Sequence, residues 1–91
     1  MRRNRSETEL IAAVLSCCEE PHRVRALIRD ANTSYNRLQP LLDHLVQQGL
    51  ISIEEHSDAV YTTTCAGMKF LCEYTSFRRL CDAYALTADN L

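Results

Sequence analysis

Amide and guanidinium side chains that can hydrogen-bond to the edges of bases gather in the middle of the chain, within residues 35–47. Asn and Gln can each form two hydrogen bonds with adenine, and Arg can pair with guanine or with a phosphate. The polar residues of this stretch lie off an apolar stripe at helical spacing; they are Tyr35, Asn36, Arg37, Gln39, Asp43, His44 and Gln47. The pattern predicts a helix that reads bases, and the alternative is the solvated outer face of an ordinary amphipathic helix.

Residue sets for other chemistry are weaker. Two glycines are too few for a glycine-rich phosphate loop, and His22, His44 and His56 fall in three separate predicted elements. That arrangement favours neither a catalytic triad nor a carboxylate pair. The five cysteines include the adjacent Cys17 and Cys18, and none forms a Cys-x-x-Cys pair. We therefore predict no enzyme activity, no metal and no cofactor, and interpret the cysteines as small buried hydrophobes in a cytoplasmic protein.

Two predicted helices precede the polar stretch. Ser6 and Glu9 form a capping box at the start of the first helix, which runs to about Cys18. A second helix is expected over residues 23–31, followed by a three-residue turn at 32–34. Both carry apolar residues spaced three and four apart, namely Leu10, Ile11, Val14, Leu15, Val24, Leu27 and Ile28.

The third helix is expected from Tyr35 to Gln48, with Ser34 as its cap and Gly49 after its end. Its inner face is formed by Leu38, Leu41, Leu42, Leu45 and Val46. Pro40 lacks the backbone donor that a regular helix uses there. Either the helix kinks at Pro40, or its regular part begins near Gln39.

Beyond residue 49 the apolar period changes from helical to alternating. Residues 50–54 and 59–63 are rich in β-branched residues and predict a two-stranded hairpin, with a turn between them. Thr64 then caps a last helix over residues 65–86. The expected fold is mainly α with a small β-hairpin (α+β): a winged helix-turn-helix at 1–64 with a basic arm at 1–5, a long dimerisation helix at 65–86 and a tail at 87–91. The predicted core is Leu10, Val14, Leu27, Leu38, Leu42, Leu45, Ile51 and Ile53.

The segment from Ala31 to Ile51 resembles the helix-turn-helix of small archaeal winged-helix DNA-binding proteins and transcriptional regulators. A second similarity runs from Tyr61 to Leu71, and together they cover about residues 8 to 80. The resemblance implies a homodimer that binds double-stranded DNA and is joined through its C-terminal helix. It implies DNA contacts from Ser34, Tyr35, Asn36, Arg37 and Gln39.

The final helix has its own signal for self-association. Phe70, Tyr74, Phe77, Cys81 and Tyr84 follow one another at alternating spacings of four and three, the pattern of a coiled-coil seam. Leu71 and Leu80 lie beside the seam and are expected to face the domain. The alternative is a helix that packs wholly on its own core.

Charge is distributed unevenly along the chain. Residues 1–40 hold seven arginines and five acidic residues, whereas residues 41–91 hold three basic and seven acidic residues, which leaves a net charge of −2. The flexible cations Arg2, Arg3 and Arg5 are expected to touch phosphates. The hairpin tip carries acidic residues at 54, 55 and 58, which a phosphate backbone would repel. A protein-interaction module without DNA binding is therefore the second hypothesis.

Overall fold

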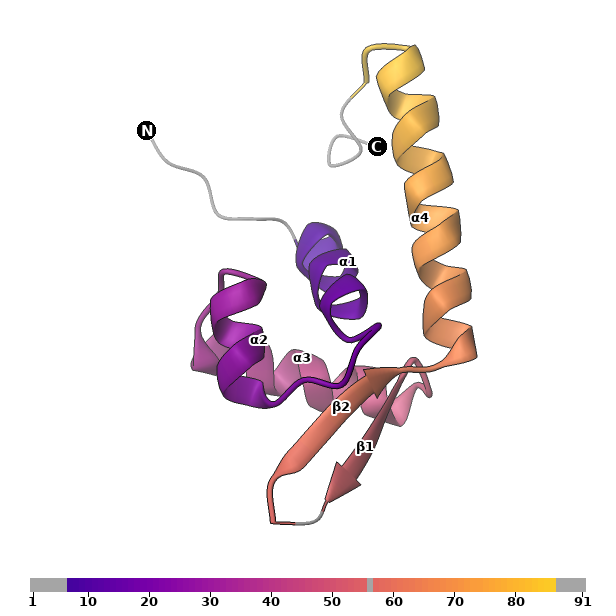
Figure 1. Ribbon diagram of the computed structural model, residues 1–91. Coiled ribbons are helices and arrows are strands. Elements are labelled where there is room, and N and C mark those ends of the chain that lie inside the picture. The colour runs from indigo at the N-terminus through magenta and orange to yellow at the C-terminus, as the bar shows by residue number, and fades with distance from the viewer. Residues whose placement is uncertain (1–6, 56, 87–91) are drawn as a thin grey trace.

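The computed structural model describes residues 7–55 and 57–86. Four helices and one hairpin follow in the predicted order: α1 (Glu7–Cys17), α2 (Val24–Asp30), α3 (Tyr35–Gln47), β1 (Ile51–Glu55), β2 (Ala59–Thr63) and α4 (Cys65–Ala83). The predicted fold class, mainly α with a small hairpin, is confirmed. The hairpin extends away from the three short helices, and α4 rises beside α1 (Figure 1). The Ser6 cap, the 1–5 arm and the 87–91 tail lie outside the described residues.

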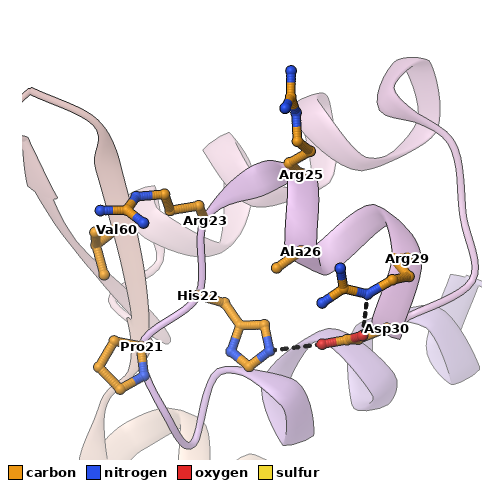
Figure 2. Close-up of a pocket in the computed structure, with 8 residues that line it drawn as sticks. All are labelled: Pro21, His22, Arg23, Arg25, Ala26, Arg29, Asp30 and Val60. Carbon is orange, nitrogen blue, oxygen red and sulfur yellow. Dashed lines mark hydrogen bonds and ion pairs between the residues drawn. The ribbon is translucent and has the colours of Figure 1, made fainter.

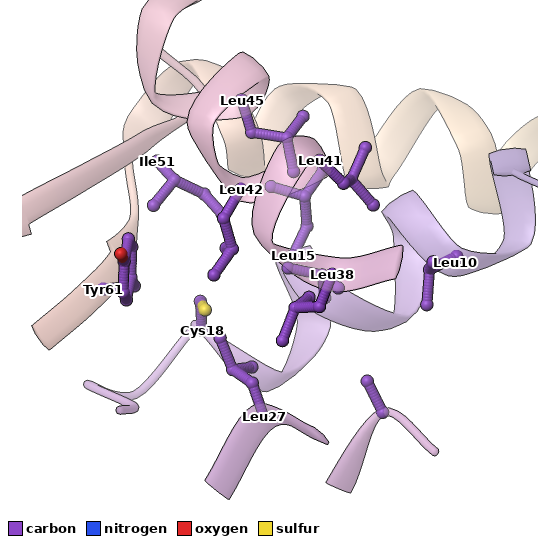
Figure 3. Close-up of a cluster of buried hydrophobic side chains, with 12 residues drawn as sticks. Leu10, Leu15, Cys18, Leu27, Leu38, Leu41, Leu42, Leu45, Ile51 and Tyr61 are labelled. Carbon is purple, nitrogen blue, oxygen red and sulfur yellow. The ribbon is translucent and has the colours of Figure 1, made fainter. Parts of the chain in front are cut away.

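The core lies where α1, α2 and α3 meet the hairpin (Figure 3). Leucines from all three helices are fully buried there, and Ile51 and Tyr61 close the core from the two strands. Seven of the eight predicted core residues are buried, whereas Ile53 is only partly buried at the margin of the cluster. The core therefore holds α3 by one face and leaves its opposite face to solvent.

The turn between α2 and α3 fixes the angle at which α3 leaves the domain. Asn32 adopts a left-handed backbone with φ of 56°, a conformation that Asn tolerates better than most residues. The backbone N–H of Thr33 donates to the carbonyl of Ile28 at 3.0 Å. Ser34 then caps α3, because its Oγ accepts from the N–H of Arg37 at 3.4 Å. The turn predicted at 32–34 is confirmed.

Pro40 lies inside α3, which is helical from Tyr35 to Gln47. Of the two alternatives left open by the sequence, a start near Gln39 is excluded. The exposed pyrrolidine ring points away from the core, and it leaves the carbonyl of Asn36 without its helical donor.

The hairpin is antiparallel, with Ile53 opposite Tyr61. A third segment joins its β2 side, because the backbones of His22 and Tyr61 exchange two hydrogen bonds of 3.0 and 2.8 Å. This bridge ties the segment before α2 to the hairpin. Nothing in the sequence around His22 indicated a strand.

The last helix starts where three elements converge. The Oγ1 of Thr64 accepts from the N–H of Gly67 at 3.2 Å, which confirms the predicted cap. Gly67 is buried, and Leu71 packs against the core next to it. Further along, a guanidinium nitrogen of Arg78 lies 3.9 Å from a carboxylate oxygen of Glu9 on α1. One side of α4 is therefore occupied by its own domain.

The five cysteines have different environments, and none of them forms a disulfide. Cys18 and Cys81 are buried and Cys17 is partly buried, as predicted. Cys65 and Cys72 are exposed on α4, so the prediction was wrong for these two, which lie on a face that the domain does not cover. Within the described residues, no three His, Cys, Asp or Glu side chains are grouped to hold a metal ion. None of the described helices is long and apolar enough to cross a membrane.

Candidate nucleic-acid interface

The exposed face of α3 carries the polar side chains singled out in the sequence. Tyr35, Asn36 and Arg37 lie in the first turn, and all three are exposed. They precede Leu38 and Leu41, which are buried on the face that packs against the core. The core thus presents an amide, a guanidinium and a phenol together at the start of the helix.

Two further predicted contacts are already engaged within the chain. The hydroxyl of Ser34 serves as the helix cap. The amide nitrogen of Gln39, which is half-buried, donates to Asp43 one turn later at 3.0 Å. That bond orients the Gln39 amide along the helix, so a base must compete with Asp43 for its N–H. Arg2, Arg3 and Arg5 lie outside the described residues.

Three arginines on α2 and its N-terminal boundary were missed as candidate contacts. Arg23, Arg25 and Arg29 are all exposed. In a helix-turn-helix, the first helix crosses the phosphate backbone while the second enters the major groove. The four-residue spacing of Arg25 and Arg29 places both on one helix face. The spacing of Arg25 and Arg29 within the predicted second helix could have identified both as candidate phosphate contacts from the sequence.

The acidic hairpin tip is partly paired with this cationic helix. The Nε of Arg23 lies 3.4 Å from a carboxylate oxygen of Asp58. Both side chains are largely exposed, so the pair adds little stability. Glu54 and Glu55 remain exposed on β1. The tip is thus still net acidic, and the cationic surface lies on α2 and the start of α3.

His22 sits between two acceptors beneath this surface. Its Nδ1 faces the carbonyl oxygen of Glu20 at 2.9 Å, and its Nε2 faces a carboxylate oxygen of Asp30 at 3.0 Å. The hydrogen bond to Glu20, and then the one to Asp30, raise the pKa of His22 above its ordinary value. The pKa of Asp30 is lowered by the Nε–H of Arg29 at 3.0 Å and by His22.

The predicted seam of α4 is divided between two faces. Cys81 is buried, and Tyr74 is partly buried and accepts from Arg78 at 2.8 Å. Leu80, expected to face the domain, instead points to solvent. Four exposed apolar residues form one stripe along the helix, and their exposed fractions are 37% for Phe70, 43% for Phe77, 55% for Leu80 and 70% for Tyr84. Met68 is also exposed but lies on another face of α4.

The fold is that of a winged helix-turn-helix. It has three short helices, of which α2 and α3 are joined by a tight turn and α3 has a polar exposed face, and a two-stranded hairpin follows as the wing. That family matches residues 4–82, and the chain belongs to it. The chain is similar in structure to Sso10a-2 from Sulfolobus solfataricus, described as a DNA-binding protein, with a TM-score of 0.81 and 24% identity over 89% of this chain and 86% of that one. None of the curated proteins matches the sequence.

Proposed function

We propose that this protein binds double-stranded DNA and acts as a transcriptional regulator in the form of a homodimer. The observation that carries the proposal is the exposed first turn of α3, where Asn36 and Arg37 project from a helix held by its buried leucines. Side chains at the start of the second helix of a helix-turn-helix meet base edges in the major groove. The DNA-binding description of Sso10a-2, which shares the fold, supports it.

In this proposal some of the arginines contact phosphates and another contacts base edges. Arg25 and Arg29 on α2, with Arg2, Arg3 and Arg5 of the N-terminal arm, contact phosphates and set affinity without reading sequence. Arg37, Asn36 and Gln39 contact base edges.

The exposed stripe of α4 supports self-association. Phe70, Phe77, Leu80 and Tyr84 leave apolar surface in water on a helix of 19 residues. A second copy that covers this stripe would remove it from solvent, at about 25 cal/mol for each Å² buried. The helix is about 28 Å long. In an antiparallel pair, the two reading heads would lie at opposite ends, close to the ~34–36 Å repeat of successive major grooves.

A protein-interaction module without DNA binding is the second candidate. The acidic wing favours it, because Glu54 and Glu55 would repel a phosphate backbone brought close to the hairpin. Retention on random duplex at low salt separates the two candidates, since an interaction module passes through.

The decisive experiment is a binding titration of variants at several salt concentrations, on a duplex selected from a random pool and on a scrambled duplex. Asn36→Ala should cost about 1–3 kcal/mol on the selected duplex and little on the scrambled one. Arg25→Gln should weaken both equally and lower the log–log salt slope by about 0.9. Gln47→Ala, at the far end of α3, is the matched control. If Asn36→Ala binds both duplexes as the parent does, α3 is not the reading element.

A further inference from the structure

An open hollow of about 460 Å³ lies between α2 and β2 (Figure 2). Sites for small ligands usually measure about 300–1,000 Å³ and combine apolar surface with a few polar groups. Pro21 from the loop, Ala26 from α2 and Val60 from β2 supply apolar surface to its lining. The hydrogen bonds between His22 and Tyr61 hold the loop and the strand together beside it. The hollow is therefore set by backbone contacts between two elements.

The rim of the hollow has more cationic donors than acceptors. Arg23, Arg25 and Arg29 all line it, against the single carboxylate of Asp30. Both oxygens of Asp30 are engaged, one with the Nε of Arg29 and the other with His22. Because Arg29 uses its Nε for Asp30, its terminal nitrogens are turned toward the side of Ala26 in Figure 2. A guanidinium edge that faces an apolar surface matches a ligand with a carboxylate at one end.

We propose that this hollow binds a small organic anion, an aromatic or branched aliphatic carboxylate. The apolar body of the ligand rests on Pro21, Ala26 and Val60, and its carboxylate pairs with the terminal nitrogens of Arg29. The apolar surface distinguishes this ligand from inorganic phosphate and from the phosphates of DNA, which have no apolar body. The proposal does not depend on DNA binding, because occupancy is measured directly on the protein.

The test is a titration of the ¹⁵N-labelled full chain with sodium benzoate, followed by amide chemical shifts, with sodium chloride at equal ionic strength as the blank. We expect saturable shifts in residues 22–30 and at Val60, and a dissociation constant of about 1 mM or below. Benzamide, which lacks the charge, and inorganic phosphate, which lacks the ring, should each bind about tenfold more weakly or not at all. Shifts that do not saturate, or equal affinity for either comparison compound, would overturn the proposal.

Two variants locate the site. Arg29→Gln removes the guanidinium charge and its terminal nitrogens and should weaken benzoate binding about tenfold, whereas Arg79→Gln, the same change on the exposed face of α4, should leave it unchanged. Ala26→Leu places a larger side chain in the hollow and should also weaken binding. Circular dichroism of each variant verifies the fold. Unchanged affinity in both Arg29→Gln and Ala26→Leu would place benzoate elsewhere and overturn the assignment.

Discussion

The hydroxyl of Thr64 donates a hydrogen bond to the carbonyl oxygen of Gly49 at 2.6 Å. The hydroxyl oxygen of Thr64 in turn accepts from the N–H of Gly67 at 3.2 Å, and the backbone N–H of Thr64 donates to the carbonyl oxygen of Leu50 at 3.0 Å. One residue therefore caps α4 and joins it to the end of α3. The orientation of α4 relative to α3 depends on this threonine.

Thr64→Ala removes the cap and the bond to Gly49 together. We expect it to lower the free energy of unfolding by about 1–2 kcal/mol, measured by urea denaturation. Thr75→Ala, on the exposed face of α4, is the matched control and should change stability by less than about 0.5 kcal/mol. Equal stability of the two variants would show that the cap does not hold α4.

Gly67→Ala should destabilise the protein although alanine favours helices. A Cβ at this position would overlap the carbonyl oxygen of Leu50 and the methyl group of Thr63. The backbone oxygen has little freedom to move, so we expect a cost of about 1–3 kcal/mol instead of the usual gain. Ser76→Ala, exposed on the same helix, is the control in the same thermal melts. A rise in melting temperature for Gly67→Ala would mean that α4 can move away from the hairpin.

Leu42→Ala tests the core. Leu42 is fully buried between α3 and the hairpin, so its truncation should cost about 2–5 kcal/mol through lost burial and a cavity. Ile53→Ala, at the margin of the core, should cost less because Ile53 is only partly buried. If denaturant titrations showed a larger loss of stability for Ile53→Ala than for Leu42→Ala, the core would not be centred on Leu42.

The stability contributed by His22 should depend on pH. Its pKa is raised in the folded protein above the ordinary value of 6.5. A raised pKa gives a contribution that is complete below 6.5 and is lost as pH increases through the folded-state pKa. The pKa of Asp30 is lowered, so the stability that Asp30 contributes is complete above pH 3.8 and is lost as the pH falls through its folded-state pKa. His22→Gln should therefore lower the melting temperature more at about pH 5.5 than at about pH 8.

His44→Gln is the control for this measurement, because His44 is exposed on α3. If the difference between the His22 variant and the parent were the same at both pH values, protonation of His22 would not contribute to the fold.

Leu80→Glu should abolish the proposed homodimer. It places a charge in the middle of the exposed stripe between Phe77 and Tyr84, where a partner helix would have to bury it unpaired. Light scattering should give about twice 10.4 kDa for the parent and about 10.4 kDa for the variant. Thr75→Glu adds the same charge at an exposed position on another face of α4 and should remain dimeric. A parent that is monomeric at high micromolar concentration would rule out the stripe as an interface.

The helices and the hairpin were predictable because each has a strong local signal. The Leu38–Leu45 stripe and the Ser34 cap together define α3, and all of these positions behave as expected. The bridge between His22 and Tyr61 was not predictable, because a single pair of residues has no periodicity. Pro40 was ambiguous, since intrinsic preference opposes a helix there and only tertiary packing of the leucines retains one.

The site was predicted only in part. The first turn of α3 is exposed as expected, yet the hydrogen bond between Gln39 and Asp43 depends on side-chain geometry that the sequence does not specify. The seam of α4 was assigned from spacing alone. By spacing, Cys81 and Phe77 belong to the same seam. In the structure α4 packs against α1, so Cys81 is buried while Phe77 remains exposed.

The acidic residues of the wing have a consequence for solubility. In the described part of the chain, β1 pairs only with β2, so its other edge presents backbone groups that another strand could join. Exposed edges of this kind are sites where copies of a protein pair and aggregate, and charged side chains oppose that pairing. Glu54 and Glu55 sit on this edge. The same charges that make the wing a poor DNA contact therefore oppose edge-to-edge pairing of β1 with the hairpin of another molecule at high protein concentration.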